Sequence, residues 1–198
     1  SVAGTGSNWT GAGSGSIDVG LEDGTAITGL YVHKNELLIY KERSIYRLQG
    51  TSPSTFVLVP FITGVGCTSH QSIVSGPGDD VSWWDDNGIH SLVATASYGD
   101  YVDAYLSHEI RDYFEHELHH GRFRQVWGQN FAAGGYLLWT VTGSGQATND
   151  RVLILDYRFT PARWALWPAL AAASIGMVID HVGARTRVPW YGTYTGFV

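Results

Sequence analysis

The stretch ITGLYVHKNELLIYKERSIYRLQG, residues 27–50, decides the fold class, because the rest of the chain repeats its design. It holds three short apolar runs separated by polar turns, and the runs are Ile27–Val32, Leu37–Tyr40 and Ile45–Leu48. Short runs rich in Ile, Leu, Val and Tyr are typical of β-strands joined by tight turns. The stretch therefore predicts an antiparallel meander, whose apolar face needs a partner to cover it.

The composition of the whole chain agrees with a rigid all-β protein. The chain has 198 residues, enough for one good core or two small ones, with 13% aromatic residues and 25 glycines. Its formal net charge of −6 argues against a protein that grips nucleic-acid phosphates, which requires a basic patch. No apolar stretch approaches the roughly 20 residues of a membrane-spanning helix, so we expect no membrane contact.

Three further groups of apolar runs follow the first meander. In the second group, Asn87 and Gly88 lie between two runs, and this dipeptide is a strong hairpin signal. The third group has four runs in some 45 residues, about the length of one β-propeller blade. The predicted strands in these groups are Phe56–Val59 with Phe61-Ile62, Ser72–Val74, Val81–Trp84, Ile89–Val93, Phe123–Gln129, Tyr136–Val141, Arg151–Asp156, Arg163–Trp167, Ser174–Ile179 and Arg187–Tyr191.

One segment breaks the β pattern. The run LSHEIRDYFEHELHH, residues 106–120, places apolar side chains on one side at helical spacing, with Ser107 as a candidate N-cap and Gly121 as a C-cap. We expect a single α-helix there, packed on a β surface or reaching another subunit. Residues 1–24, in contrast, are rich in Gly and Ser and predict a long loop.

The order of these motifs resembles the β-propeller region of tailed-bacteriophage virion proteins of the tail-nozzle and head–tail stabilisation type. The resemblance spans about residues 15–198 and is carried by the stretches ITGLYVHKNELLIYKERSIYRLQG, GDDVSWWDDNGIHSL, LSHEIRDYF, NDRVLILDYRFTPARWALW and YGTYTGFV. It implies one domain over residues 1–198, built of β-propeller-type four-stranded meander blades with an inserted α-helix near 106–120. Only about three and a half blades are present, so we expect a partial or incomplete ring and a chain that belongs to a longer protein.

The resemblance also implies a function. A protein of this family is a structural virion component, made in the cytoplasm of the bacterial host and located in the phage tail or head–tail connector. Its partners would be other virion proteins, namely tail, portal or adaptor components, within a symmetric homo-oligomer around the DNA exit channel. DNA would pass nearby without specific binding, and an acidic surface facing it would repel the genome and let it slide.

One alternative is a zinc metallohydrolase. Residues 116–120, HELHH, match the H-E-x-x-H pattern, in which two histidines one helical turn apart hold zinc and the glutamate activates water. The residues concerned are His116, Glu117 and His120. No Gly and third His follow at the spacing of the extended motif, so a third ligand would have to come from farther along the chain.

Other candidate sites have structural explanations of their own. Asp79, Asp80, Asp85 and Asp86 bracket a predicted hairpin and suit calcium, but turn formation explains them as well. The tryptophans Trp83, Trp84, Trp164 and Trp167 suit a glycan-binding surface, although aromatic packing between blades is favoured. Cys67 is interpreted as a small buried residue. We therefore predict a non-enzymatic protein and assign no catalytic residue, cofactor or metal ligand.

Overall fold

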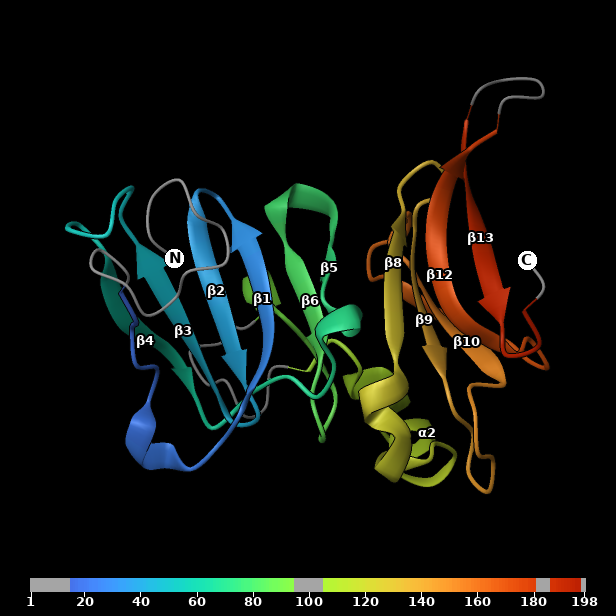
Figure 1. Cartoon of the computed structure of the whole chain (residues 1–198). Helices are drawn as coiled ribbons and strands as arrows, with labels where there is room; N and C mark the ends of the chain where they lie inside the picture. Colours follow the sequence, from blue (N-terminus) through green and yellow to red (C-terminus); the bar gives the residue numbers. More distant parts are fainter. Residues whose placement is uncertain (1–14, 95–104, 181–185, 197–198) are drawn as a thin grey trace.

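Strands dominate the computed structural model, which describes residues 15–94, 105–180 and 186–196 (Figure 1). In these ranges the strands form four antiparallel sheets, and in each sheet the strands that follow one another along the chain are paired. The all-β class and the meander topology predicted from the sequence are therefore confirmed. The sheets described do not close into a barrel or a ring.

The first sheet corresponds closely to the stretch from which the fold was predicted. Lys34 and Asn35 have positive φ angles of 47° and 67°, which suits the tight turn between its first two strands. Pro60 lies in the last strand, at the sheet edge, where a missing N–H group is tolerated. The strands are β1 (Ile27–His33), β2 (Glu36–Lys41), β3 (Ser44–Gln49) and β4 (Val57–Thr63).

The second sheet is smaller and contains the predicted hairpin. The Asp85 N–H donates to the Gly88 carbonyl at 2.8 Å and closes the turn between its last two strands. The strands are β5 (Val74–Ser75), β6 (Val81–Trp84) and β7 (Ile89–Ser91). The strand predicted at Ser72–Val74 is wrong in its first part, because a 3-10 turn over His70–Ser72 precedes β5. A second 3-10 turn, Pro77–Asp79, leads into β6.

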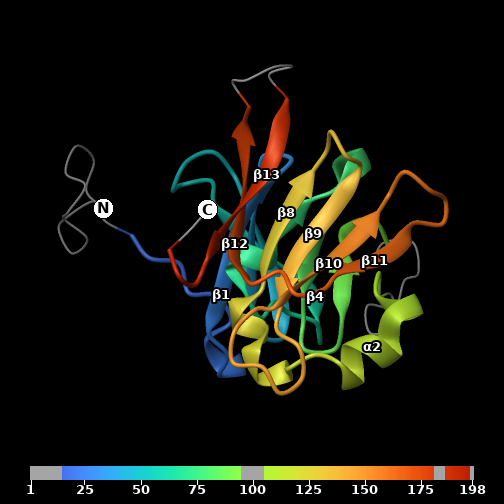
Figure 2. The same cartoon turned by 90° about the vertical axis from the view of Figure 1, so that its right-hand side faces the viewer.

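The third and fourth sheets complete the series. The third sheet contains β8 (Trp127–Phe131), β9 (Tyr136–Val141), β10 (Arg151–Asp156) and β11 (Arg163–Trp167), and Figure 2 shows these strands side by side in chain order. The fourth contains β12 (Ala172–Ile179) and β13 (Arg187–Thr193). Within the described residues the fourth sheet has two strands, in agreement with the predicted half unit.

The four sheets are stacked face against face, and an apolar core fills each of the three interfaces (Figure 1). The core between the first and second sheets includes Tyr40 and Trp83. The core between the second and third includes Trp84 and Trp139. The third and fourth sheets enclose a smaller core around Ile175. The second and third sheets are thus covered on both faces.

Two adjacent tryptophans in β6 join the first two cores. Side chains alternate between the faces of a strand, so Trp83 points to the first sheet and Trp84 to the third. Both are fully buried. The Trp83 ring meets the ring of Tyr40 edge to face, with 5.6 Å between centroids. The predicted role of aromatic residues as packing between sheets is confirmed for this pair.

The inserted helix is much shorter than predicted. Instead of one helix over residues 106–120, the segment forms a 3-10 turn over His108–Ile110, the α-helix α2 (Arg111–His116) and a second 3-10 helix over His120–Gln125. Its apolar side was predicted correctly, since Phe114 and Leu118 are buried in the core between the second and third sheets. No helix in the described ranges has the length and apolar character needed to cross a membrane.

The helix ends early because its backbone pairs with a distant loop. The His119 N–H donates to the Thr142 carbonyl at 2.9 Å, and the Ser144 N–H donates to the Glu117 carbonyl at 2.8 Å. Leu118 forms an isolated antiparallel bridge with Gly143. These bonds hold Leu118 and His119 in an extended path directly after Glu117, which still has helical backbone angles, so the pairing overrides the local helical preference.

An ion pair fixes the segment that leads into the first sheet. The Lys41 side chain is 3% exposed and donates to the Asp23 carboxylate and to the carbonyls of Val19 and Gly20. The hydrogen bond from Lys41, helped by the Thr25 N–H, lowers the pKa of Asp23 from its ordinary 3.8 to about 2. Of the predicted loop over residues 1–24, residues 1–14 lie outside the described residues and the rest contains a 3-10 turn at Leu21–Asp23.

Truncation of either tryptophan in β6 is expected to destabilise the fold strongly. Trp83→Ala or Trp84→Ala removes a fully buried indole and leaves a cavity, which costs about 3–5 kcal/mol. Urea unfolding followed by circular dichroism would measure this loss. Trp167→Ala is the control, because Trp167 is 42% exposed and its truncation should cost less than about 1 kcal/mol. Equal losses in all three variants would contradict the burial of the pair.

The Asp23–Lys41 pair is expected to make stability depend on pH. The folded state lowers the pKa of Asp23, so the carboxylate stabilises the fold above about pH 4 and loses this effect as the pH falls towards 2. Asp23→Asn should therefore lower the melting temperature at pH 7, and its difference from the wild type should vanish near pH 2. Asp18→Asn, at an exposed position, is the control. A difference that persisted at pH 2 would contradict the assignment.

Candidate functional site

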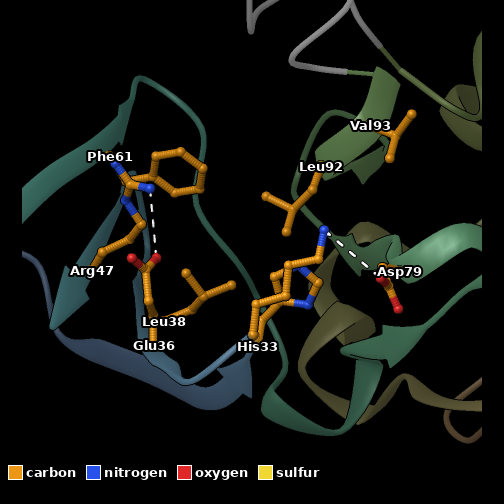
Figure 3. Close-up of a pocket in the computed structure, with 9 residues that line it drawn as sticks. His33, Glu36, Leu38, Arg47, Phe61, Asp79, Leu92 and Val93 are labelled. Atoms are coloured by element: carbon orange, nitrogen blue, oxygen red, sulfur yellow. Dashed lines mark ion pairs between the residues drawn. The ribbon is translucent and has the colours of Figure 1, made fainter. Parts of the chain in front are cut away.

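A pocket lies between the first sheet and the loops of the second (Figure 3). It has a volume of about 390 Å³, within the roughly 300–1,000 Å³ typical of small-molecule sites. Leu38 and Phe61 come from the first sheet, and Leu92 and Val93 face them from the residues after β7. Polar and charged side chains complete the lining, namely His33, Lys34, Glu36, Arg47 and Asp79.

Arg47 is the best positioned polar group of this pocket. Its guanidinium lies 4.3 Å from the centroid of the Phe61 ring and 3.5 Å from the nearer Glu36 carboxylate oxygen. Its Nε–H is buried and has no hydrogen-bond partner among the described residues. On the other side, Lys34 and Asp79 form an exposed ion pair at 3.9 Å. The arrangement places the Arg47 guanidinium, a hydrogen-bond donor, beside the apolar side chains of the pocket.

A second, more polar pocket of about 270 Å³ lies near the turn between β6 and β7. Arg124 and Glu42 form an ion pair at 2.9 Å across it. Asp86 lies in the same pocket, where burial and the neighbouring Asp85 carboxylate raise its pKa. His120 reaches it from the segment after α2. Cys67 also lines this pocket, but its thiol donates to the Ser69 carbonyl rather than to a neighbouring base.

The H-E-x-x-H residues do not adopt the helical arrangement that zinc binding requires. His116 is the last residue of α2, Glu117 is exposed at its end, and His120 begins the next 3-10 helix. The two histidines have separate surroundings. His116 lies 3.6 Å from Asp112, whereas His120 Nε2 lies 3.1 Å from the Phe114 carbonyl and its ring contacts Phe123. The expected juxtaposition on one helix face is therefore absent.

The four aspartates considered for calcium are also kept apart. Asp79 and Asp80 precede β6, whereas Asp85 and Asp86 follow it, and a strand rises about 3.3 Å per residue. Asp80 accepts hydrogen bonds from Val81 N–H and Val93 N–H, and Asp85 accepts them from the backbone of the hairpin. In the described part of the chain, no three His, Cys, Asp or Glu side chains gather in a way that could hold a metal ion.

The remaining predicted residues are mainly structural. Trp83 and Trp84 are fully buried, so this pair cannot form a glycan-binding surface. Trp164 is half-buried beside Trp139, and Trp167 is exposed at the edge of the third sheet. Cys67 is buried as predicted, and burial raises the pKa of its thiol to about 12, which keeps it protonated.

The outward faces of the first and fourth sheets expose large apolar side chains. We define the leading face as the outward side of the first sheet, with Leu30, Val32, Leu37, Leu48 and Leu58. We define the trailing face as the outward side of the fourth sheet, with Gly176, Val178, Val188 and Trp190. Large apolar side chains are exposed on both. The apolar residues on both sides of β2 already signalled a two-sided sheet in the sequence, but the trailing face gave no comparable signal.

Comparison with known proteins does not assign this chain to a family. No protein-family model matches the sequence, and no curated protein matches it.

Substitution of the two histidines separates a structural role from a shared metal site. His120→Ala removes ring contacts with Phe114 and Phe123 and a hydrogen bond, which should cost about 1 kcal/mol of stability. His116→Ala should change stability by less than about 0.5 kcal/mol, because His116 is exposed. Thermal unfolding with and without added zinc would measure both. Zinc stabilisation that either substitution abolished would contradict separate roles.

Proposed function

We propose that this protein is a structural component of a tailed-bacteriophage virion, in the tail or the head–tail connector, built of β-propeller-type blades. The observation that carries the proposal is the relation between neighbouring sheets. The first strands of the second, third and fourth sheets contact one another, β5 with β8 and β8 with β12, and β1 contacts the 3-10 turn over His70–Ser72 that precedes β5. Blades arranged around a common axis bring their innermost strands together in this way.

The contents of the interfaces support a rigid building block. Each interface is filled by large aromatic or branched side chains, and the indole N–H of Trp139 donates to the Ser72 carbonyl at 3.1 Å between the second and third sheets. The thiol of Cys67, which lines the more polar pocket, is kept protonated by its burial and donates to the Ser69 carbonyl rather than to a base. A net charge of −6 fits a protein near a DNA channel that does not hold the DNA.

The proposal predicts that the chain is a fixed part of the mature particle. In purified particles of the phage that encodes it, an antibody against the chain should label the tail or the head–tail junction, as seen by immunogold electron microscopy. Particles made with an amber mutation in the gene should lack the label and lose infectivity by orders of magnitude. Absence of the chain from purified infectious particles would contradict the proposal.

A further inference from the structure

We infer that the trailing face of one copy of this chain binds the leading face of another. This inference names the partner surface within the proposed assembly and rests on that structural role. It is drawn from the way the sheets pack within one chain. Each internal interface joins the following side of one sheet to the preceding side of the next. The trailing face is the following side of the fourth sheet, and the leading face is the preceding side of the first. A contact between them would therefore be an interface of the same kind.

The exposed fraction of one residue in the second strand of each sheet shows that the trailing face is uncovered. Tyr40 in β2, Trp84 in β6 and Leu138 in β9 all point to the following sheet, and each has an exposed fraction of 0%. The corresponding residue of β13 is Trp190, because it pairs with Gly176 on the side opposite Ile175. Trp190 is 50% exposed. A position covered in three sheets is therefore open in the fourth.

The leading face also has apolar side chains that no preceding sheet covers within the described residues. In the fourth sheet, Ala172 and Ile175 of the first strand point to the preceding sheet and are 0% and 5% exposed. On the first strand of the first sheet, Leu30 and Val32 point in the corresponding direction and are 49% and 70% exposed. The same side of β2 is covered towards Lys41, because Ile39 is 5% exposed and Lys41 binds Val19–Asp23. The open part of the leading face therefore lies around Leu30 and Val32.

The chemistry of the two faces favours contact between them. The exposed side chains that would meet are apolar or glycine, and the Lys41–Asp23 ion pair lies at the far end of β2 from Val32. On the trailing face, the Trp190 ring projects beside Gly176, which has no side chain. The leucines and Val32 of the leading face offer an apolar surface against which that ring can pack. Removing this apolar area from water provides the driving force.

A second copy is the occupant that continues the stack in the same sense. Trailing face on leading face is a heterologous contact, which forms a ring when the rotation closes and a fibre when it does not. In two copies the described residues bring together eight sheets, four from each chain, and a closed ring of that size lies within the range of about four to eight blades known for propellers.

Two adjacent residues provide a matched test. Val178 is 39% exposed on the trailing face, whereas Ile179 is 44% exposed and points to the opposite side of β12. In light scattering after size-exclusion chromatography, the wild type should have a mass of at least twice 21.6 kDa. Val178→Glu should reduce it to 21.6 kDa, and Ile179→Glu should not. Circular dichroism would verify that both variants are folded.

Cross-linking tests the pairing of the faces independently of stability. Cys67 is fully buried, so a bis-maleimide reagent should react only with introduced cysteines. A mixture of Val32→Cys and Val178→Cys proteins should give a cross-linked dimer, and neither variant alone should do so. Self-cross-linking of one variant would show an isologous contact and overturn the inference.

The outcomes separate this inference from the proposed function. A monomeric wild type, or loss of the oligomer in both glutamate variants, would overturn the end-to-end contact even if the chain is found in virions. An end-to-end oligomer of a chain that is absent from virions would leave the contact intact and remove the virion role.

Discussion

The opposite orientation of Trp83 and Trp84 is the constraint on which the rest of the structure depends. A strand of four residues with two indoles buried on different faces has no side left for water. The second sheet must therefore lie between two others. Because each indole is a large part of its core, the first and third sheets are fixed relative to one another through β6. The stacked architecture follows from one dipeptide together with the apolar pattern of its neighbours.

The sequence predicted most strands because their signals are local. Alternating apolar residues and the Asp85–Gly88 turn lie within a few residues of the elements they define. The helix was predicted less well because its end is set by residues far away. Residues 117–119 have helical periodicity, but their backbone pairs with residues 142–144. A pattern within one window cannot contain that competition.

The candidate sites show the same division between local and distant information. The H-E-x-x-H match assumed a helix that continues to His120, so the early end at His116 separated the two histidines. The four aspartates were close in sequence but lie at opposite ends of β6. The pocket at Arg47 could not be predicted, because it joins the first sheet to Leu92, and nothing in the sequence indicates that these segments meet.

A contact between end faces has a higher free-energy cost between two chains than inside one chain. Inside one chain, neighbouring sheets are held together covalently, so their apolar contacts need to offset only the ordering of the chain. The same contact between two chains must also offset lost translational and rotational freedom, which is estimated at 4–15 kcal/mol or more. In the proposed ring of two copies this contact forms twice, and the second junction forms within a pair that is already joined. A high effective concentration then offsets most of the cost of that second junction. Ring closure therefore favours the end-to-end assembly over an open pair of chains.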